Sequence, residues 1–81
     1  MRKYNKKSNI SGSIIKEARI SKNMSREELS NKLQLMGINV ERTFIYKVES
    51  ENTILKDFEL IAICKILEID YKKLENELEE I

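Results

Sequence analysis

The sequence contains no histidine, tryptophan or proline, and only two glycines and one cysteine in 81 residues. Without histidine the chain has no imidazole base for a Ser-His-Asp or Cys-His arrangement, and Cys64 alone cannot form a zinc cluster. Gly12 and Gly37 are too far apart to build a phosphate-binding loop of known spacing. These absences argue against an enzyme, a metal site and a bound cofactor.

The single cysteine also excludes an internal disulfide bond, which fits a reducing compartment. The first nine residues, MRKYNKKSN, are basic, but no apolar segment follows them, so they do not resemble a signal peptide. No apolar run approaches the roughly 18 residues that a membrane-spanning helix needs. We therefore expect a cytoplasmic protein in which Cys64 is a small core residue.

The lack of proline and the many Leu, Ile, Lys and Glu residues favour an all-α fold. The apolar spacing predicts five helices, at about residues 12–22, 25–36, 41–49, 57–67 and 70–81. Ser25 begins a capping box, Gly37 ends the second helix and Asp70 caps the fifth. Residues 1–9 are expected to be a flexible basic arm, and residues 10–81 one domain. The predicted inward side chains are Ile14, Ile15, Ala18, Leu29, Leu33, Met36, Ile45, Val48, Leu60, Ile61, Cys64 and Leu67, and Phe44 lies at the border of the buried side. The apolar residues of the final helix are Tyr71, Leu74, Leu78 and Ile81.

The charge is unevenly distributed, although its formal total is only +1. Up to residue 56 there are twelve basic and six acidic residues, whereas from residue 57 on there are three basic and eight acidic residues. A basic body with an acidic tail indicates an anionic partner for the first part. Charge alone leaves an ordinary solvated surface equally open.

Residues 41–49, ERTFIYKVE, predict an amphipathic helix with Ile45 and Val48 toward the core. Glu41 and Glu49 fall on the same side, and Glu49 lies about 40° from Ile45. A carboxylate in that position requires a partner. The opposite face has no acid and carries groups that suit base edges, with an ordinary solvated face as the alternative. It is formed by Arg42, Thr43, Tyr46, Lys47 and Ser50.

The order of these elements resembles the Xre-like family of helix-turn-helix regulators, the group of phage Cro proteins and repressors. The resemblance covers residues 14–74. It rests on an arginine in the first helix, a capped second helix, a third helix ending I-x-x-V-E, and the following segment ELIAICKILEIDYKKL. It implies a compact five-helix domain of the lambda-repressor type, with the helix-turn-helix motif at about residues 25–49.

The resemblance assigns roles to individual residues. In the family an arginine of the first helix pairs inside the protein with a glutamate at the end of the third, and Arg19 and Glu49 match these positions. Arg26 matches the residue that binds phosphate and braces the third helix. The base-reading positions match Arg42, Thr43 and Lys47, with Tyr46 beside them, and further phosphate contacts are expected from Ser50, Lys56, Lys3, Lys6 and Lys7.

The sequence departs from the family pattern in two places. Residues 34–38 look like an insertion that lengthens the turn, as in a sub-branch of the family, so we expect the second helix to extend by one turn. Glu49 is often followed in the family by Asn-Gly and a basic residue, whereas Ser50-Glu51-Asn52 follows here. Glu51 would repel a nearby phosphate, and Lys56 is expected to compensate.

The resemblance implies a sequence-specific DNA-binding transcriptional regulator, a repressor by family precedent, that reads the major groove as a homodimer. Leu74, Leu78 and Ile81 form a stripe that fits either core packing or a dimer seam. The acidic final helix could also dock a protein partner. A protein-interaction module, or an antitoxin that binds DNA and masks a toxin, therefore remains open.

Overall fold

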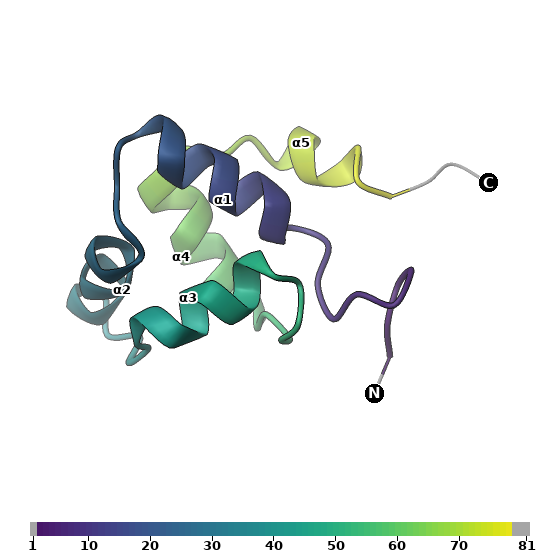
Figure 1. Ribbon diagram of the computed structural model, residues 1–81. Helices are drawn as coiled ribbons and strands as arrows, with labels where there is room; N and C mark the ends of the chain where they lie inside the picture. The colour runs from purple at the N-terminus through teal and green to yellow at the C-terminus, as the bar shows by residue number, and fades with distance from the viewer. Residues whose placement is uncertain (1, 79–81) are drawn as a thin grey trace.

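The structure, a computed structural model, describes residues 2–78 as a chain of five helices (Figure 1). They are α1 (Gly12–Ser21), α2 (Arg26–Leu35), α3 (Arg42–Glu49), α4 (Asp57–Leu67) and α5 (Tyr71–Glu75). Residues 2–78 contain no strand, only an isolated bridge between Tyr4 and Lys7. The predicted all-α fold with five helices is confirmed. None of the helices in this part of the chain is long and apolar enough to cross a membrane.

Short capping sequences set where α2 and α5 begin. The Ser25 hydroxyl accepts a hydrogen bond from the Glu28 backbone N–H (3.0 Å), and the Glu28 carboxylate accepts one from the Ser25 N–H (3.1 Å). The predicted capping box is therefore present. At α5 the Asp70 carboxylate accepts a bond from the Lys72 N–H (3.0 Å). Each cap satisfies donors that the first turn of a helix leaves without intrahelical partners.

One apolar core joins the first four helices. α1 and α2 each pack against both α3 and α4, and Figure 1 shows α4 behind α1 and α3. Full burial of a large apolar side chain stabilises the fold by roughly 1.5–3 kcal/mol, so six such residues account for much of the driving force. These six are Ile15, Leu29, Leu33, Ile45, Val48 and Ile63.

The rotation of α4 about its axis differs from the prediction. Ile61, predicted to face the core, is 45% exposed, whereas Ala62 and Ile63 are buried beside the correctly predicted Cys64 and Leu67. Every position from residue 60 to 64 is apolar or cysteine. A helical period alone therefore cannot identify which side of this segment faces inward. The assignment of Ile61 to the core is wrong.

Two further residues lie outside the core because of where α2 and α3 end and begin. α2 ends at Leu35, and Met36 is its C-cap and is about half exposed. Gly37 follows with φ +88°, a left-handed conformation that glycine adopts without steric cost. Glu41 is the N-cap of α3 and is exposed, so its predicted inward orientation is wrong.

The C-terminal helix is shorter than predicted, because α5 ends at Glu75. Leu74 is buried, whereas Tyr71 and Leu78 are each about half exposed. Of these three apolar residues, only Leu74 packs in the core, so core packing does not account for Leu78. Ile81, the last member of the predicted stripe, lies outside the described residues.

Candidate nucleic-acid interface

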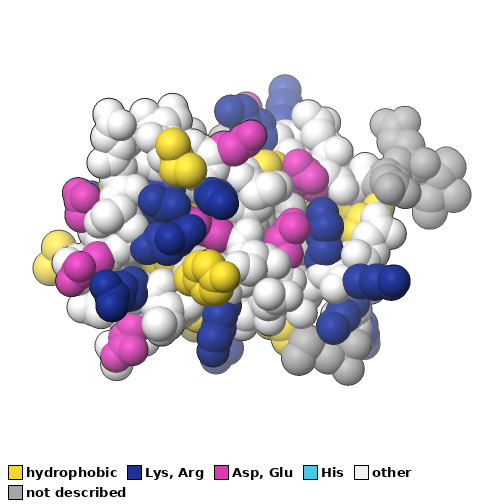
Figure 2. All heavy atoms as spheres, viewed as in Figure 1, with side chains coloured by type: hydrophobic (Ala, Val, Ile, Leu, Met, Phe, Trp, Pro, Cys, Tyr) yellow, Lys and Arg dark blue, Asp and Glu magenta, His cyan; other side chains and the backbone are white. Residues whose placement is uncertain are grey.

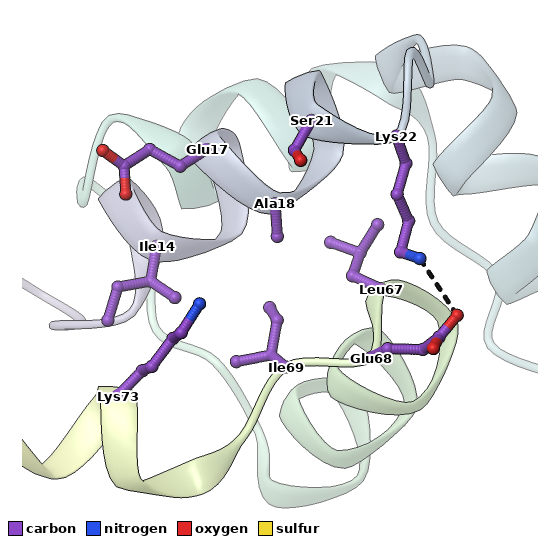
Figure 3. Close-up of a pocket in the computed structure, with 9 residues that line it drawn as sticks. All are labelled: Ile14, Glu17, Ala18, Ser21, Lys22, Leu67, Glu68, Ile69 and Lys73. Carbon is purple, nitrogen blue, oxygen red and sulfur yellow. Dashed lines mark hydrogen bonds and ion pairs between the residues drawn. The ribbon is translucent and has the colours of Figure 1, made fainter.

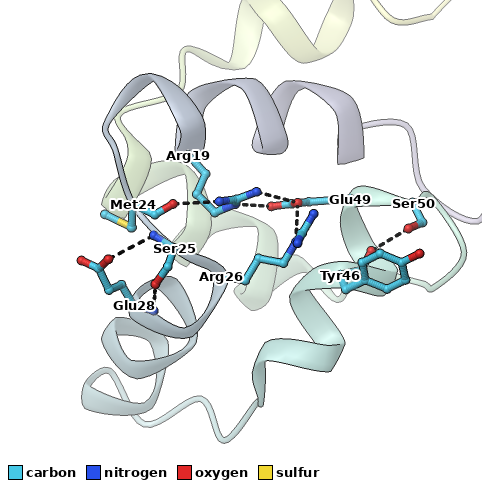
Figure 4. Close-up of polar contacts among 8 residues, drawn as sticks. All are labelled: Arg19, Met24, Ser25, Arg26, Glu28, Tyr46, Glu49 and Ser50. Atoms are coloured by element: carbon cyan, nitrogen blue, oxygen red, sulfur yellow. Dashed lines mark hydrogen bonds and ion pairs between the residues drawn. The ribbon is translucent and has the colours of Figure 1, made fainter.

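Glu49, the carboxylate on the inner side of α3, is held by Arg19 of α1 (Figure 4). Arg19 donates from Nε to Oε2 (2.6 Å) and from Nη2 to Oε1 (3.1 Å). The Nη1 of Arg19 donates to the carbonyl oxygen of Met24 (2.8 Å). The two residues are only 7% and 8% exposed. The predicted pairing of Arg19 with Glu49 is present, and it explains a charged residue on the apolar side of the helix.

A second arginine binds the same carboxylate. The Nε of Arg26, on α2, donates to Glu49 Oε1 (3.0 Å). The Arg26 guanidinium carbon also lies 5.3 Å from the ring centre of Tyr46, within the range of cation–π attraction. The Arg26 side chain remains partly accessible, because it is 37% exposed. Arg26 thus braces α3, as the resemblance implied, and retains surface for an anion.

These contacts join three helices at one carboxylate. Glu49 belongs to α3, Arg19 to α1 and Arg26 to α2. Two guanidinium groups surround one carboxylate, so the junction keeps one excess positive charge. A buried charge left without its partner costs roughly 3–5 kcal/mol, and this penalty resists rotation of α3 about its axis. The opposite face of α3 is therefore held toward the exterior.

That opposite face is exposed at each predicted position. Arg42, Thr43, Lys47 and Ser50 are exposed, and Tyr46 is 58% exposed. The Ser50 hydroxyl donates to the carbonyl oxygen of Tyr46 (2.8 Å), so its proton is used within the helix end. Figure 2 looks onto the surface that includes α2 and α3, where Lys and Arg side chains gather.

A hollow of about 480 Å³ lies between α2 and the outer face of α3. Four of the predicted contact residues meet there: Arg26, Arg42, Thr43 and Tyr46. Glu27 of α2 also lines it, and a neighbouring hollow includes Glu41. Reading α3 alone missed Glu27, which comes from the preceding helix, and wrongly placed Glu41 on the inner side. The acid-free region is thus the outer face of α3, bordered by carboxylates near its N-terminus.

The other predicted phosphate contacts lie on two further segments. Lys56 is the exposed N-cap of α4, and its ammonium is 5.9 Å from the Phe58 ring centre. Lys3 and Lys6 are exposed. Lys7 forms an ion pair with Glu51 (3.3 Å), which sequence analysis did not predict. None of these four lysines lines the hollow between α2 and α3.

A second hollow of about 480 Å³ lies between α1 and α5 (Figure 3). Its apolar wall includes Ile14, Leu67 and Ile69, and the ion pair of Lys22 with Glu68 (3.0 Å) stands at one end. These three apolar residues are already buried in the core. The hollow is therefore a surface depression above the core, with opposite charges at its edge.

Cys64 is buried in the core, and burial raises the pKa of its thiol above the ordinary 9.0. A thiol that holds its proton is a poor nucleophile, so Cys64 packs as a small apolar residue. Among residues 2–78, no group of three or more His, Cys, Asp or Glu side chains could hold a metal ion.

Comparisons of this chain with protein-family models, with curated proteins and with solved structures found no match. Function is therefore inferred from the contacts and exposures described above.

Proposed function

We propose that the chain is a DNA-binding transcriptional regulator of the Xre-like type, in which α2 and α3 are the two helices of a helix-turn-helix motif. The observation that carries the proposal is the junction at Glu49. It fixes α3 so that Arg42, Thr43, Tyr46 and Lys47 all project away from the core. An eight-residue helix with one outer face of cations and hydroxyls has the size and chemistry to enter a major groove.

Each outer side chain has a distinct role in this proposal. Arg42 would bridge O6 and N7 of a guanine with its planar guanidinium, and Lys47 would bind the same acceptors less rigidly. Thr43 would hydrogen-bond a base edge or pack its methyl group on thymine. Tyr46 would lie against sugar or phosphate, since Arg26 already covers one side of its ring.

Phosphate contacts would surround α3. Arg26 offers the accessible part of its side chain, and Lys56, Lys3 and Lys6 are exposed ammonium groups. The Ser50 hydroxyl can still accept a hydrogen bond. Each neutralised phosphate releases counterions, so affinity should fall with salt by a slope of about 0.9 per contact. A homodimer that represses transcription would read two half-sites about 34 Å apart.

The test is selection of bound fragments from random duplex DNA, followed by affinity measurements on the selected site. Arg42→Ala should lose about 1–3 kcal/mol of discrimination at one base pair while the helical content stays unchanged. Lys65→Ala, which removes an exposed cation from α4, is the matched control and should bind like wild type. Wild-type affinity for the selected site in Arg42→Ala would refute the base-reading assignment.

A protein-interaction module is the second candidate. Phe58 and Ile61 are each about half exposed on α4, and Leu78 is similarly exposed after α5. Exposed apolar side chains such as Phe58 and Ile61, which lie three positions apart on one helix, can form part of a protein contact. Retention on random duplex DNA across a salt series separates the two candidates, because a pure protein-binding module would pass through at low salt. An antitoxin would both be retained and bind a protein.

A further inference from the structure

The C-terminal end of α3 is enclosed by residues that precede α1. The Asn9 side-chain amide donates to the carbonyl oxygens of Val48 (3.2 Å) and Thr53 (2.8 Å). Its oxygen accepts a bond from the Gly12 backbone N–H (2.9 Å). One side chain therefore joins the end of α3, the segment after it and the start of α1.

Glu51 has a backbone conformation that is unfavourable for residues other than glycine. It has a left-handed backbone with φ +62°, where glycine is the usual residue after a helix. Its N–H donates to the Val48 carbonyl (2.9 Å), the Asn52 N–H donates to the Lys47 carbonyl (3.0 Å), and these two bonds close the helix end. The Ser8 N–H donates to the Glu51 carbonyl (3.0 Å), which ties the N-terminal segment to the same turn.

Within residues 2–78, the Glu51 side chain has one charged partner, Lys7. Its Oε2 is closed to solvent and has no hydrogen bond among the described residues, but it lies 3.3 Å from Lys7 Nζ. At this distance the two groups form an ion pair, although their geometry does not meet the angular requirements of a hydrogen bond. The Lys7 ammonium therefore compensates a covered carboxylate oxygen that would otherwise remain unneutralised. Space is tight here, because a Cβ on Gly12 would lie only 2.7 Å from Glu51 Cγ.

We propose that Lys7 is a positioning residue for DNA binding and that Asn9 fixes the end of α3 beside it. Lys7 acts through Glu51, by neutralising a carboxylate that would otherwise repel a nearby phosphate, and not by contacting phosphate itself. This indirect role replaces the direct phosphate contact that the sequence analysis expected of Lys7. The proposal rests on the proposed function, because it requires the turn after α3 to lie beside a duplex.

A double-mutant cycle tests the role of Lys7, with the selected duplex as the probe. Lys7→Ala should weaken binding about fivefold, because a carboxylate beside the phosphates then keeps its full charge. Glu51→Gln in the Lys7→Ala background should restore affinity to within about twofold of Glu51→Gln alone. A double variant as weak as Lys7→Ala would overturn the proposal, because Lys7 would then contact the phosphate directly.

Hydrogen exchange of the free protein tests Asn9 without any DNA. Asn9→Ala should speed exchange of the Glu51 and Asn52 amides at least tenfold while amides in the middle of α4 stay unchanged. Asn9→Asp keeps the acceptor for Gly12 and loses both donors, so it should speed exchange of the same two amides. This variant replaces Asn9→Ala in the test if the alanine variant does not fold. Unchanged exchange in a folded variant would overturn the proposed role of Asn9. If the wild-type protein does not bind DNA but Asn9→Ala speeds exchange of the Glu51 and Asn52 amides, the proposed function fails and the structural role of Asn9 stands.

Discussion

Replacing Glu49 by glutamine tests the junction that orients α3. The change keeps the size and shape of the side chain but removes the charge that two arginines share. The amide oxygen can still accept hydrogen bonds, whereas the amide N–H groups would face guanidinium donors. Arg19, only 7% exposed, would then hold a buried charge without its counter-ion.

The expected cost follows from burial. Breaking a buried pair by removing one partner costs roughly 3–5 kcal/mol, and almost all of it comes from Arg19 because Arg26 is partly solvated. A domain of this length has a total stability of about 4–12 kcal/mol. Glu49→Gln should therefore remove at least a quarter of the free energy of unfolding and, at the upper limit, all of it.

Urea denaturation followed by helical circular dichroism measures the effect. With a slope near 1 kcal/mol per molar urea, typical of small proteins, a loss of this size should lower the midpoint by roughly 3–5 M. Glu28→Gln is the matched control, because the same chemical change falls on an exposed side chain where glutamine also fits a capping box, and it should cost less than about 0.5 kcal/mol. A Glu49→Gln variant within about 1 kcal/mol of wild type would refute the view that this carboxylate anchors α3.

Three further predictions follow from contacts described above. Gly12→Ala should lower stability by about 1–3 kcal/mol in thermal unfolding, because the new Cβ would overlap the Val48 carbonyl oxygen, and a neutral result would mean that α1 shifts freely. Cys64 should react with a thiol reagent only after denaturation. Because burial raises the pKa of the native thiol above 9.0, the native thiol keeps its proton at a pH where the unfolded chain loses it, so the free energy of unfolding should fall as pH rises above 9.0. Cys64→Ala should abolish this contribution to the pH dependence. Arg26→Ala should weaken binding to all duplex sequences nearly equally, and a loss confined to one sequence would instead assign it to base reading.

The parts of the structure that the sequence predicts are those governed by local rules. The α2 capping box and the outward face of α3 depend on residues within a few positions of one another. The Arg19–Glu49 contact spans 30 residues, but a carboxylate on an apolar face requires a partner, and the family resemblance indicated which one.

The parts that could not be predicted depend on tertiary contacts. The side of α4 that faces the core is determined by the helices that pack against it. Residues 60–64 place apolar side chains or cysteine on every side of α4, so the sequence of this helix does not identify its inner side. The bonds from Asn9 reach the end of α3 across 39 and 44 residues and involve backbone carbonyls, which carry no sequence signal. The Lys7–Glu51 pair follows from the left-handed turn after α3, and the sequence marks that turn with no glycine.

The shortness of α3 makes its outer surface a property of the whole domain. An isolated helix of eight residues is unstable in water, because nucleating a helix costs more than so few hydrogen bonds return. Its side chains are therefore aligned only while α1, α2 and the segment before α1 hold the helix in place. Any ligand that requires this alignment must bind the folded chain more tightly than the unfolded chain. A ligand at one hundred times its dissociation constant would add about 2.7 kcal/mol to the free energy of unfolding. Melting temperature can thus serve as a readout of ligand binding for this molecule.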